Sequence, residues 1–144
     1  MTTPTSLPSA GRRPVLVAGV QVPRPVSVPA VLWAAARLIE ANGHYQGDHV
    51  PDPFDREMCI PHCLRPMSIV AAVKCAVSGD PHMPSLLADK AIAVLALRLD
   101  GGPEFGDIFS LESHVDEWGD ALGRTAEEAV ALLEATAAEG GVAA

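Results

Sequence analysis

The apolar positions of residues 28–42 repeat with the period of an α-helix and predict the first helix of the chain. Ser27 is placed to cap this helix, Pro29 falls in the first turn where no backbone donor is needed, and Asn42-Gly43 supplies a left-handed stop. The face turned to the core should consist of residues three or four positions apart: Val28, Val31, Leu32, Ala35 and Ile39.

The same period predicts further helices at residues 67–77 and 84–100 and a helix that starts at the capping box Thr125-Ala126-Glu127-Glu128. A shorter helical piece is expected at 111–118. Residues 84–100 are apolar almost all round, so we expect this segment to be the central helix. The predicted fold class is mainly α, a compact bundle of four to five helices.

The remaining segments set the domain boundaries. Residues 1–14 lack periodic apolar positions and are expected to be a disordered N-terminal arm. Val15–Val22 is rich in β-branched residues and is interpreted as one strand or an extended arm on the helices. Residues 15–139 then form a single helical domain, and residues 140–144 a frayed tail.

Charge is distributed unevenly along the chain. The formal net charge is −8, and residues 100–144 hold eleven acidic residues against the single base Arg124. An acidic field repels phosphate backbones, so we expect no nucleic-acid partner. We interpret residues 104–120 as a solvated acidic surface with Trp118 turned inward.

Cysteine content and hydropathy indicate the compartment. Cys59, Cys63 and Cys75 are an odd set that cannot all pair, which favours a reducing cytoplasm. The apolar run Ala91–Leu97 is far shorter than the roughly 20 residues that cross a bilayer. We therefore expect a cytoplasmic protein without a membrane partner.

The stretch from residue 43 to residue 66 is long, irregular and rich in Pro and Gly, and connections of this length are typically functional or mobile. Its polar start and the turn before the last helix supply the candidate binding residues His44, Tyr45, Gln46, Asp48, Trp118 and Asp120. We expect Gln46 and Trp118 to lie close together, with the amide oxygen of Gln46 able to accept the indole N–H of Trp118.

The segment Cys59-Ile60-Pro61-His62-Cys63 carries the ligand types of a tetrahedral zinc site. A second closely spaced pair is missing, so reduced, buried cysteines are the competing interpretation and no cofactor is the main expectation. Cys59 or Cys63 with His62 or His44 is also a candidate nucleophile and base, although no flanking motif supports this chemistry.

Several short motifs share an order along the chain: Ile39-Glu40-Ala41-Asn42-Gly43, then Gln46-Gly47-Asp48, Ile69-Val70-Ala71-Ala72-Val73, Trp118-x-Asp120 and Arg124-Thr125. In this order the chain resembles a family of small helical proteins of unknown function from high-GC Gram-positive bacteria and their phages. The chain departs from that pattern at His44, Ser68 and Gly119. The resemblance implies a helical fold and a bacterial or prophage setting, and it transfers no catalytic residue.

Two functional hypotheses follow. The first is a non-enzymatic accessory or regulatory module that binds another protein through residues 43–66 or the acidic residues 104–120. The second is a small ligand-binding or metal-binding domain, or an enzyme, with a pocket near residues 44–63. Self-association, for example by pairing of Val15–Val22 with another subunit, stays open.

Overall fold

The computed structural model describes residues 15–17, 20–22, 24–99 and 106–143. Its helices are α1 (Val28–Asn42), α2 (Ile69–Ser78), α3 (Leu86–Arg98), α4 (Ile108–Gly119) and α5 (Ala126–Ala143), with a short 3-10 turn, η1, at His62–Leu64. The fold is mainly helical, as the sequence predicts. The predicted arm at residues 1–14 lies outside the described residues.

Side-chain caps fix where each helix begins, because the first backbone N–H groups of a helix have no partner within it. Ser27 accepts from the N–H of Ala30 at the start of α1, and Ser68 and Ser85 do the same for α2 and α3. Asp107 caps α4 by accepting from the N–H of Ser110. Since Ser68 is a cap, α2 begins at Ile69 rather than at the predicted Met67.

The predicted capping box of the last helix is confirmed. The N–H of Thr125 donates to Oε1 of Glu128 at 2.9 Å, and the N–H of Glu128 donates to Oγ1 of Thr125 at 3.2 Å. Helix α5 extends to Ala143, and the frayed tail at residues 140–144 stays a prediction.

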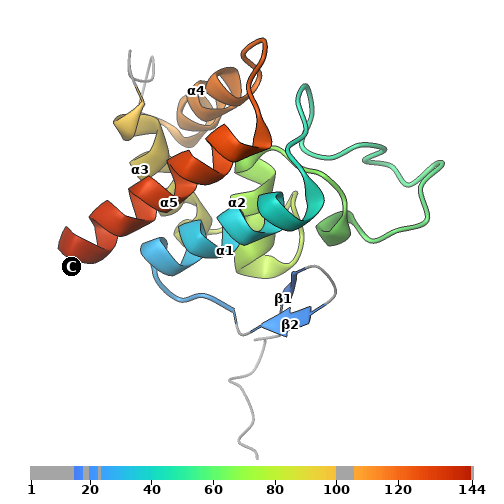
Figure 1. Ribbon diagram of the computed structural model, residues 1–144, viewed down its shortest axis with the longest axis horizontal. Helices are drawn as coiled ribbons and strands as arrows, with labels where there is room; N and C mark the ends of the chain where they lie inside the picture. Colours follow the sequence, from blue (N-terminus) through green and yellow to red (C-terminus); the bar gives the residue numbers. More distant parts are fainter. Residues whose placement is uncertain (1–14, 18–19, 23, 100–105, 144) are drawn as a thin grey trace, which may run out of the picture.

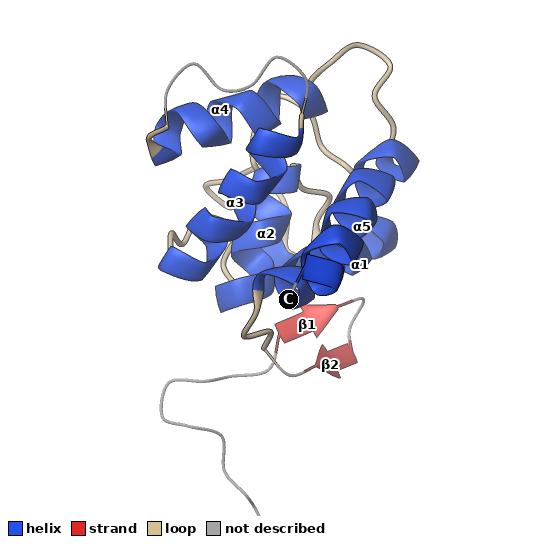
Figure 2. Ribbon diagram, turned by 90° about the vertical axis from the view of Figure 1, so that its left-hand side faces the viewer, coloured by secondary structure: helices blue, strands red, loops and turns tan. Residues whose placement is uncertain are grey.

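Helix α2 is the central helix of the molecule. It packs against α1, α3 and α4, and all eight residues from Ile69 to Ala76 are buried. Figure 2 shows α4 across one end of the molecule, with α3 and the pair α1 and α5 on either side of α2. The prediction that the apolar segment 84–100 is central is wrong, because Leu86, Val94 and Leu97 of α3 are exposed.

The two longest helices, α1 and α5, pack against each other along one side of the bundle. The α1 residues that we expected to face the core are buried, except Val28, which is half-buried. Trp33 lies on the outer side of α1, 42% exposed, with the guanidinium of Arg37 5.6 Å from its ring centroid. Arg37 also pairs with Glu134 of α5 and so joins the two helices.

The segment Val15–Val22 contains two short strands, β1 (Val15–Val17) and β2 (Val20–Val22), rather than one. They pair antiparallel, with Val15 opposite Val22 and Val17 opposite Val20. This ribbon lies below the helices in Figure 1, where β1 contacts α1, α2 and η1.

Candidate functional site

The long stretch from Gly43 to Pro66 is a closed loop whose two ends meet. The N–H of Tyr45 donates to the carbonyl of Met67 at 3.0 Å, and the N–H of Met67 donates to the carbonyl of Gly43 at 3.2 Å. The N–H of Ser68 also donates to the carbonyl of His49 at 2.8 Å. In Figure 1 this 43–66 loop, coloured teal to green, extends from one end of the helical body.

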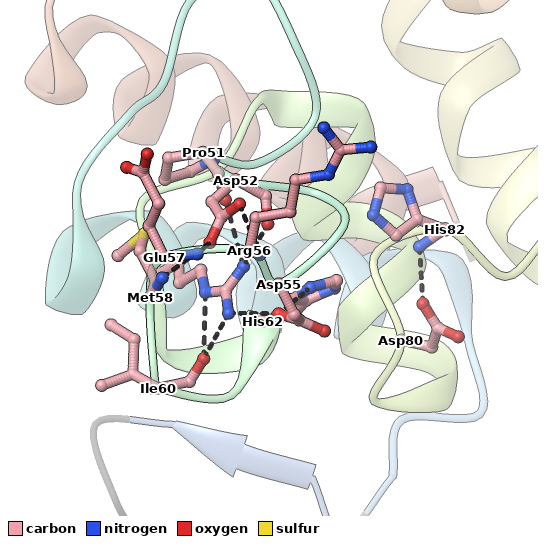
Figure 3. Close-up of polar contacts among 11 residues, drawn as sticks. Pro51, Asp52, Asp55, Arg56, Glu57, Met58, Ile60, His62, Asp80 and His82 are labelled. Carbon is pink, nitrogen blue, oxygen red and sulfur yellow. Dashed lines mark hydrogen bonds and ion pairs between the residues drawn. The ribbon is translucent and has the colours of Figure 1, made fainter.

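Asp52 organises the outer part of the loop. Its carboxylate accepts the N–H of Arg56 at 2.9 Å, of Glu57 at 2.8 Å and of Met58 at 2.7 Å, so one side chain fixes a whole turn (Figure 3). These backbone donors lower the pKa of Asp52, because they stabilise the ionised form. The carboxylate therefore stays charged in mild acid.

Arg65 ties the same loop together from inside. Only 1% of Arg65 is exposed, and the acceptors around its guanidinium are Asp55 and the carbonyls of Pro51, Asp52 and Ile60. These five hydrogen bonds match the five N–H donors of a guanidinium. Arg65 is thus a structural centre and has no donor left for a ligand.

The outside of the loop carries two exposed large apolar side chains beside the exposed charged residues Asp55, Arg56 and Glu57. Phe54 is 79% exposed, Ile60 is 43% exposed, and the guanidinium of Arg56 lies 5.8 Å from the ring centroid of Phe54. An open depression of about 410 Å³ is formed by residues between Asp55 and Arg65: Asp55, Met58, Cys59, Ile60, Pro61, His62 and Arg65. An internally braced loop therefore presents two large apolar side chains beside an open hollow of mixed polar and apolar lining.

Three histidine rings join the loop to the connection between α2 and α3. The ring of His49 stacks on that of His82 with centroids 5.7 Å apart, and His62 meets His82 edge-on at 5.4 Å. Nε2 of His62 also lies 3.0 Å from Oδ1 of Asp55 (Figure 3). These residues are 13 and 20 positions apart, so no short motif in the sequence marks the contact between their rings.

The start of the loop is fastened to the turn between α4 and α5. Nε2 of Gln46 donates to the carbonyls of Gly119 at 3.0 Å and Ala121 at 2.9 Å, and the N–H of Gly47 donates to Oδ1 of Asp120 at 2.9 Å. Gln46 therefore lies against the end of α4, at Gly119, the residue that follows Trp118. The bonding differs from our expectation, because the amide of Gln46 donates to backbone carbonyls instead of accepting the indole N–H.

Trp118 is held by Arg124. The Arg124 guanidinium carbon lies 3.7 Å from the Trp118 ring centroid, and Nε of Arg124 donates to the Trp118 carbonyl at 2.9 Å. Nε2 of His44 lies 3.3 Å from the point where a Cβ on Gly119 would stand. His44 and Gly119, two positions at which the chain departs from the family pattern described above, are thus neighbours in the structure.

The candidate binding residues fall into two groups. The first group lies where the start of the loop meets the end of α4 and consists of His44, Gln46, Trp118 and Asp120. The contacts in this group hold the start of the loop to the end of α4 and to the turn that follows it. Tyr45 is half-buried, and Oδ1 of Asp48 accepts the N–H of His49. Burial lowers the pKa of His44, while the carboxylate of Asp120 acts in the opposite direction.

A buried polar layer lies between α2 and α4. Nζ of Lys74 lies 3.1 Å from Oε2 of Glu112, and the two side chains are 8% and 18% exposed. Burial raises the pKa of Asp116, one turn further along α4, to about 7, with Asp120 and Glu112 adding to the rise. The interpretation of 104–120 as a solvated acidic surface is therefore wrong for Glu112 and Asp116, which face the interior.

The cysteines do not assemble a metal site in the described part of the chain. Cys59 is exposed, Cys63 half-buried and Cys75 buried, and all three are free. Within the described residues no three His, Cys, Asp or Glu side chains are arranged to hold a metal ion, so Cys59, His62 and Cys63 form no ready ligand set. Burial raises the pKa of Cys63 and raises that of Cys75 to about 12, which suits inert thiols.

Fold and site together define a small helical domain that carries one internally braced, apolar-tipped loop. The chain belongs to the family described as Family of unknown function (DUF6197), whose model matches residues 23–139. No curated protein and no solved structure matches the chain. None of the helices in the described ranges is long and apolar enough to cross a membrane.

Proposed function

We propose that this protein is a non-enzymatic accessory or regulatory module that binds another protein through the 43–66 loop. The observation that carries the proposal is the exposure of Phe54 and Ile60 on a loop that Arg65 and Asp52 hold rigid from within. Exposed apolar groups on a preorganised backbone favour binding, because little conformational entropy is lost on association.

The chemistry of the loop surface indicates the kind of contact. Met58, Ile60 and Pro61 line the depression of about 410 Å³, and Phe54 stands exposed on the same loop. Large apolar anchors that fill pockets contribute most of the energy of protein interfaces. The partner is therefore expected to offer an apolar surface to Phe54 and Ile60.

The acidic residues 104–120 are the less suitable docking surface. Glu112 is paired with the buried Lys74, and Asp120 accepts the N–H of Gly47. Carboxylates that are committed to internal partners contribute little to attraction of a basic protein. The 43–66 loop is thus preferred over the acidic segment.

The origin of the protein and its cellular compartment are proposed from separate observations. The order of motifs resembles proteins of high-GC Gram-positive bacteria and their phages, and the three cysteines are free. Free thiols are typical of a reducing compartment. We infer a bacterial or prophage protein that acts in the cytoplasm.

Site-specific photo-crosslinking tests the proposal. A photo-reactive amino acid at Arg56, beside Phe54, should capture a defined protein in the cells that naturally express the chain, and one at Lys90 on α3 should not. The captured protein, once purified, should bind Phe54→Ser and Ile60→Ser more weakly than the unmodified chain by about tenfold or more.

Phe109→Ser is the matched control, because Phe109 is a phenylalanine of α4 with 76% exposure, close to that of Phe54. Its affinity for the captured protein should equal that of the unmodified chain. Equal affinities of the Phe54, Ile60 and Phe109 variants would exclude the loop as the docking surface.

A small ligand-binding or enzymatic role is the second candidate, with zinc as a cofactor alternative. It is favoured by one observation, the presence of Cys59, His62 and Asp55 around the same depression. A thermal-shift screen of metals and small molecules tests it: a ligand that stabilises the unmodified chain and leaves Cys59→Ser and His62→Gln unaffected would support this candidate.

A further inference from the structure

A second hollow lies between α1 and α5, the two helices that pack side by side in Figure 1. It has a volume of about 320 Å³ and is formed by the last turn of α1 and the first half of α5: Glu40, Ala126, Glu127, Val130, Ala131 and Glu134. We call it the α1–α5 groove. Cavities that hold whole ligands span about 300–1,000 Å³, so this groove suits one long side chain.

The floor of the groove is apolar and held in place by the core. Ala126 and Val130 are half-buried and pack against the hydrophobic core, while Ala131 beside them is exposed. Covering apolar surface of this kind is favourable, and the long side chains of arginine and lysine do so with their methylene stems while the charged end stays in contact with water.

The rim of the groove is negatively charged. It carries the three carboxylates of Glu40, Glu127 and Glu134. One cation stands against them, since Nε of Arg37 lies 3.2 Å from Oε1 of Glu40 and the same guanidinium pairs with Glu134. Glu127 has no cationic partner among the described residues. Three carboxylates against one guanidinium leave two negative charges at the rim uncompensated.

Arg37 shows which cation the rim accommodates. Its guanidinium already lies between a glutamate of α1 and a glutamate of α5. Each carboxylate can accept several hydrogen bonds, so Glu40 and Glu134 keep acceptor capacity for a second guanidinium, and Glu127 offers a carboxylate without a competing partner. A guanidinium is more weakly hydrated than an ammonium and matches carboxylates with two parallel donors, which favours arginine over lysine.

An exposed aromatic side chain extends the groove along α1. Trp33 lies one turn before Arg37, is 42% exposed, and has the Arg37 guanidinium 5.6 Å from its ring centroid. Tryptophan contributes strongly to protein interfaces when a partner covers its ring. A small free cation in the groove leaves this ring uncovered, whereas a protein segment with an apolar residue near its arginine covers both.

We infer that the α1–α5 groove is a docking site for an arginine side chain of a partner protein. The stem of that arginine lies on Val130 and Ala131, its guanidinium lies among the rim glutamates, and an apolar residue of the same segment covers Trp33. The inference does not depend on the docking role of the 43–66 loop, because no residue of that loop lines the groove.

Nuclear magnetic resonance titration with a designed peptide tests the site. The probe is acetyl-Ala-Leu-Ala-Ala-Arg-Ala-Ala-Leu-Ala-amide, in which a leucine stands three positions from the arginine on each side. It should shift the amide signals of Ala126, Val130 and Ala131 and the indole signal of Trp33 in a saturable way. The same peptide with citrulline in place of arginine keeps the shape without the charge, and should bind about fivefold or more weakly.

A charge variant of the protein is compared with a matched control. Glu127→Gln removes the carboxylate that has no partner of its own and should weaken binding of the arginine peptide by about threefold. Glu117→Gln removes the same charge from an exposed position of α4 and should leave the affinity unchanged. Equal affinities of these two variants would show that the rim does not recognise the peptide.

A second pair of variants tests the groove itself. Ala131→Leu fills the groove from an exposed position and should abolish the shifts at Ala126 and Val130. Ala138→Leu adds the same group two turns further along α5, at an exposed position outside the lining, and should keep them. The melting temperature of each variant verifies that it is folded.

Three outcomes overturn the inference: equal affinity for the arginine and citrulline peptides, full affinity of Ala131→Leu, or spermidine binding to the same amides as tightly as the arginine peptide. The last result would make the occupant a small polyamine rather than a protein. Phe54→Ser should bind the arginine peptide normally, so a failure of the loop as a docking surface remains distinguishable from a failure of the groove.

Discussion

At the scale of single residues, Arg65 stands out because its side chain donates five hydrogen bonds. A buried guanidinium is costly unless its donors are satisfied, and Arg65 satisfies them with one carboxylate and three backbone carbonyls. The sequence shows only an arginine next to Pro66 in a Pro-rich stretch. Its acceptors are mainly backbone groups whose positions depend on the folded loop, so no residue pattern marks them in advance.

Replacement of Arg65 by Lys tests this role. Lysine keeps the charge but offers three donors on one nitrogen, so acceptors at Pro51, Asp52 and Ile60 lose partners. Arg65→Lys should lower the free energy of unfolding by about 2–4 kcal/mol, measured by chemical denaturation. Arg56→Lys, an exposed change in the same loop, should stay within about half a kcal/mol, and similar losses in the two variants would contradict the assignment.

At the scale of elements, the starts and stops of helices were the features best predicted from sequence. Ser27 and the Thr125 capping box act within one turn, so their chemistry is visible in a short window. Which side of α4 faces the interior was less predictable. The sequence favoured a solvated acidic surface, because Lys74, the partner of Glu112, is 38 positions away on α2.

Helix α4 should make stability depend on pH through Asp116. Its folded pKa of about 7 lies above the ordinary 3.8, so the folded state binds the extra proton. The stability contributed by the protonated form is complete below about pH 3.8 and is lost as pH rises through about 7. Asp116→Asn mimics the protonated form and should be more stable than the unmodified chain by about 1–3 kcal/mol at about pH 8, and equal to it at about pH 4.

Denaturation of both proteins across this range measures the effect. Glu117→Gln is the matched control, since Glu117 is the exposed neighbour of Asp116 on the same helix. A stability difference for Asp116→Asn that does not vary with pH would show that the carboxyl group titrates normally in the folded protein.

At the scale of the whole molecule, composition identified the fold class, but the predicted central helix was wrong. Residues 84–100 form the longer apolar segment, which suggested a central helix, yet they include the charged residues Asp89, Lys90, Arg98 and Asp100, whereas residues 69–76 include only Lys74. The surroundings decide burial: α2 has α1, α3 and α4 around it, while α3 exposes Leu97, which is 71% accessible. A lysine enters the centre because Glu112 of α4 pairs with it.

The exposed side of α3 gives a matched pair of substitutions. Leu95 is fully buried, and Leu97, two positions later, is largely exposed. Leu95→Asp should unfold the domain, because an unpaired buried carboxylate costs several kcal/mol out of a total of about 5–15 kcal/mol. Leu97→Asp should leave the melting temperature within a few degrees of the unmodified chain. Equal melting temperatures of the two variants would mean that α3 is packed differently.

The inward bracing of the 43–66 loop also has an evolutionary consequence. Because Asp52 and Arg65 bind mostly backbone atoms, the side chains at Phe54, Glu57 and Ile60 are free to change without loss of the loop's shape. Related sequences are then expected to diversify at these positions while they retain an acid and an arginine at positions 52 and 65. A library randomised at residues 54, 57 and 60 should accordingly yield mostly folded proteins, so that a single scaffold can acquire new binding partners by drift at the loop tip.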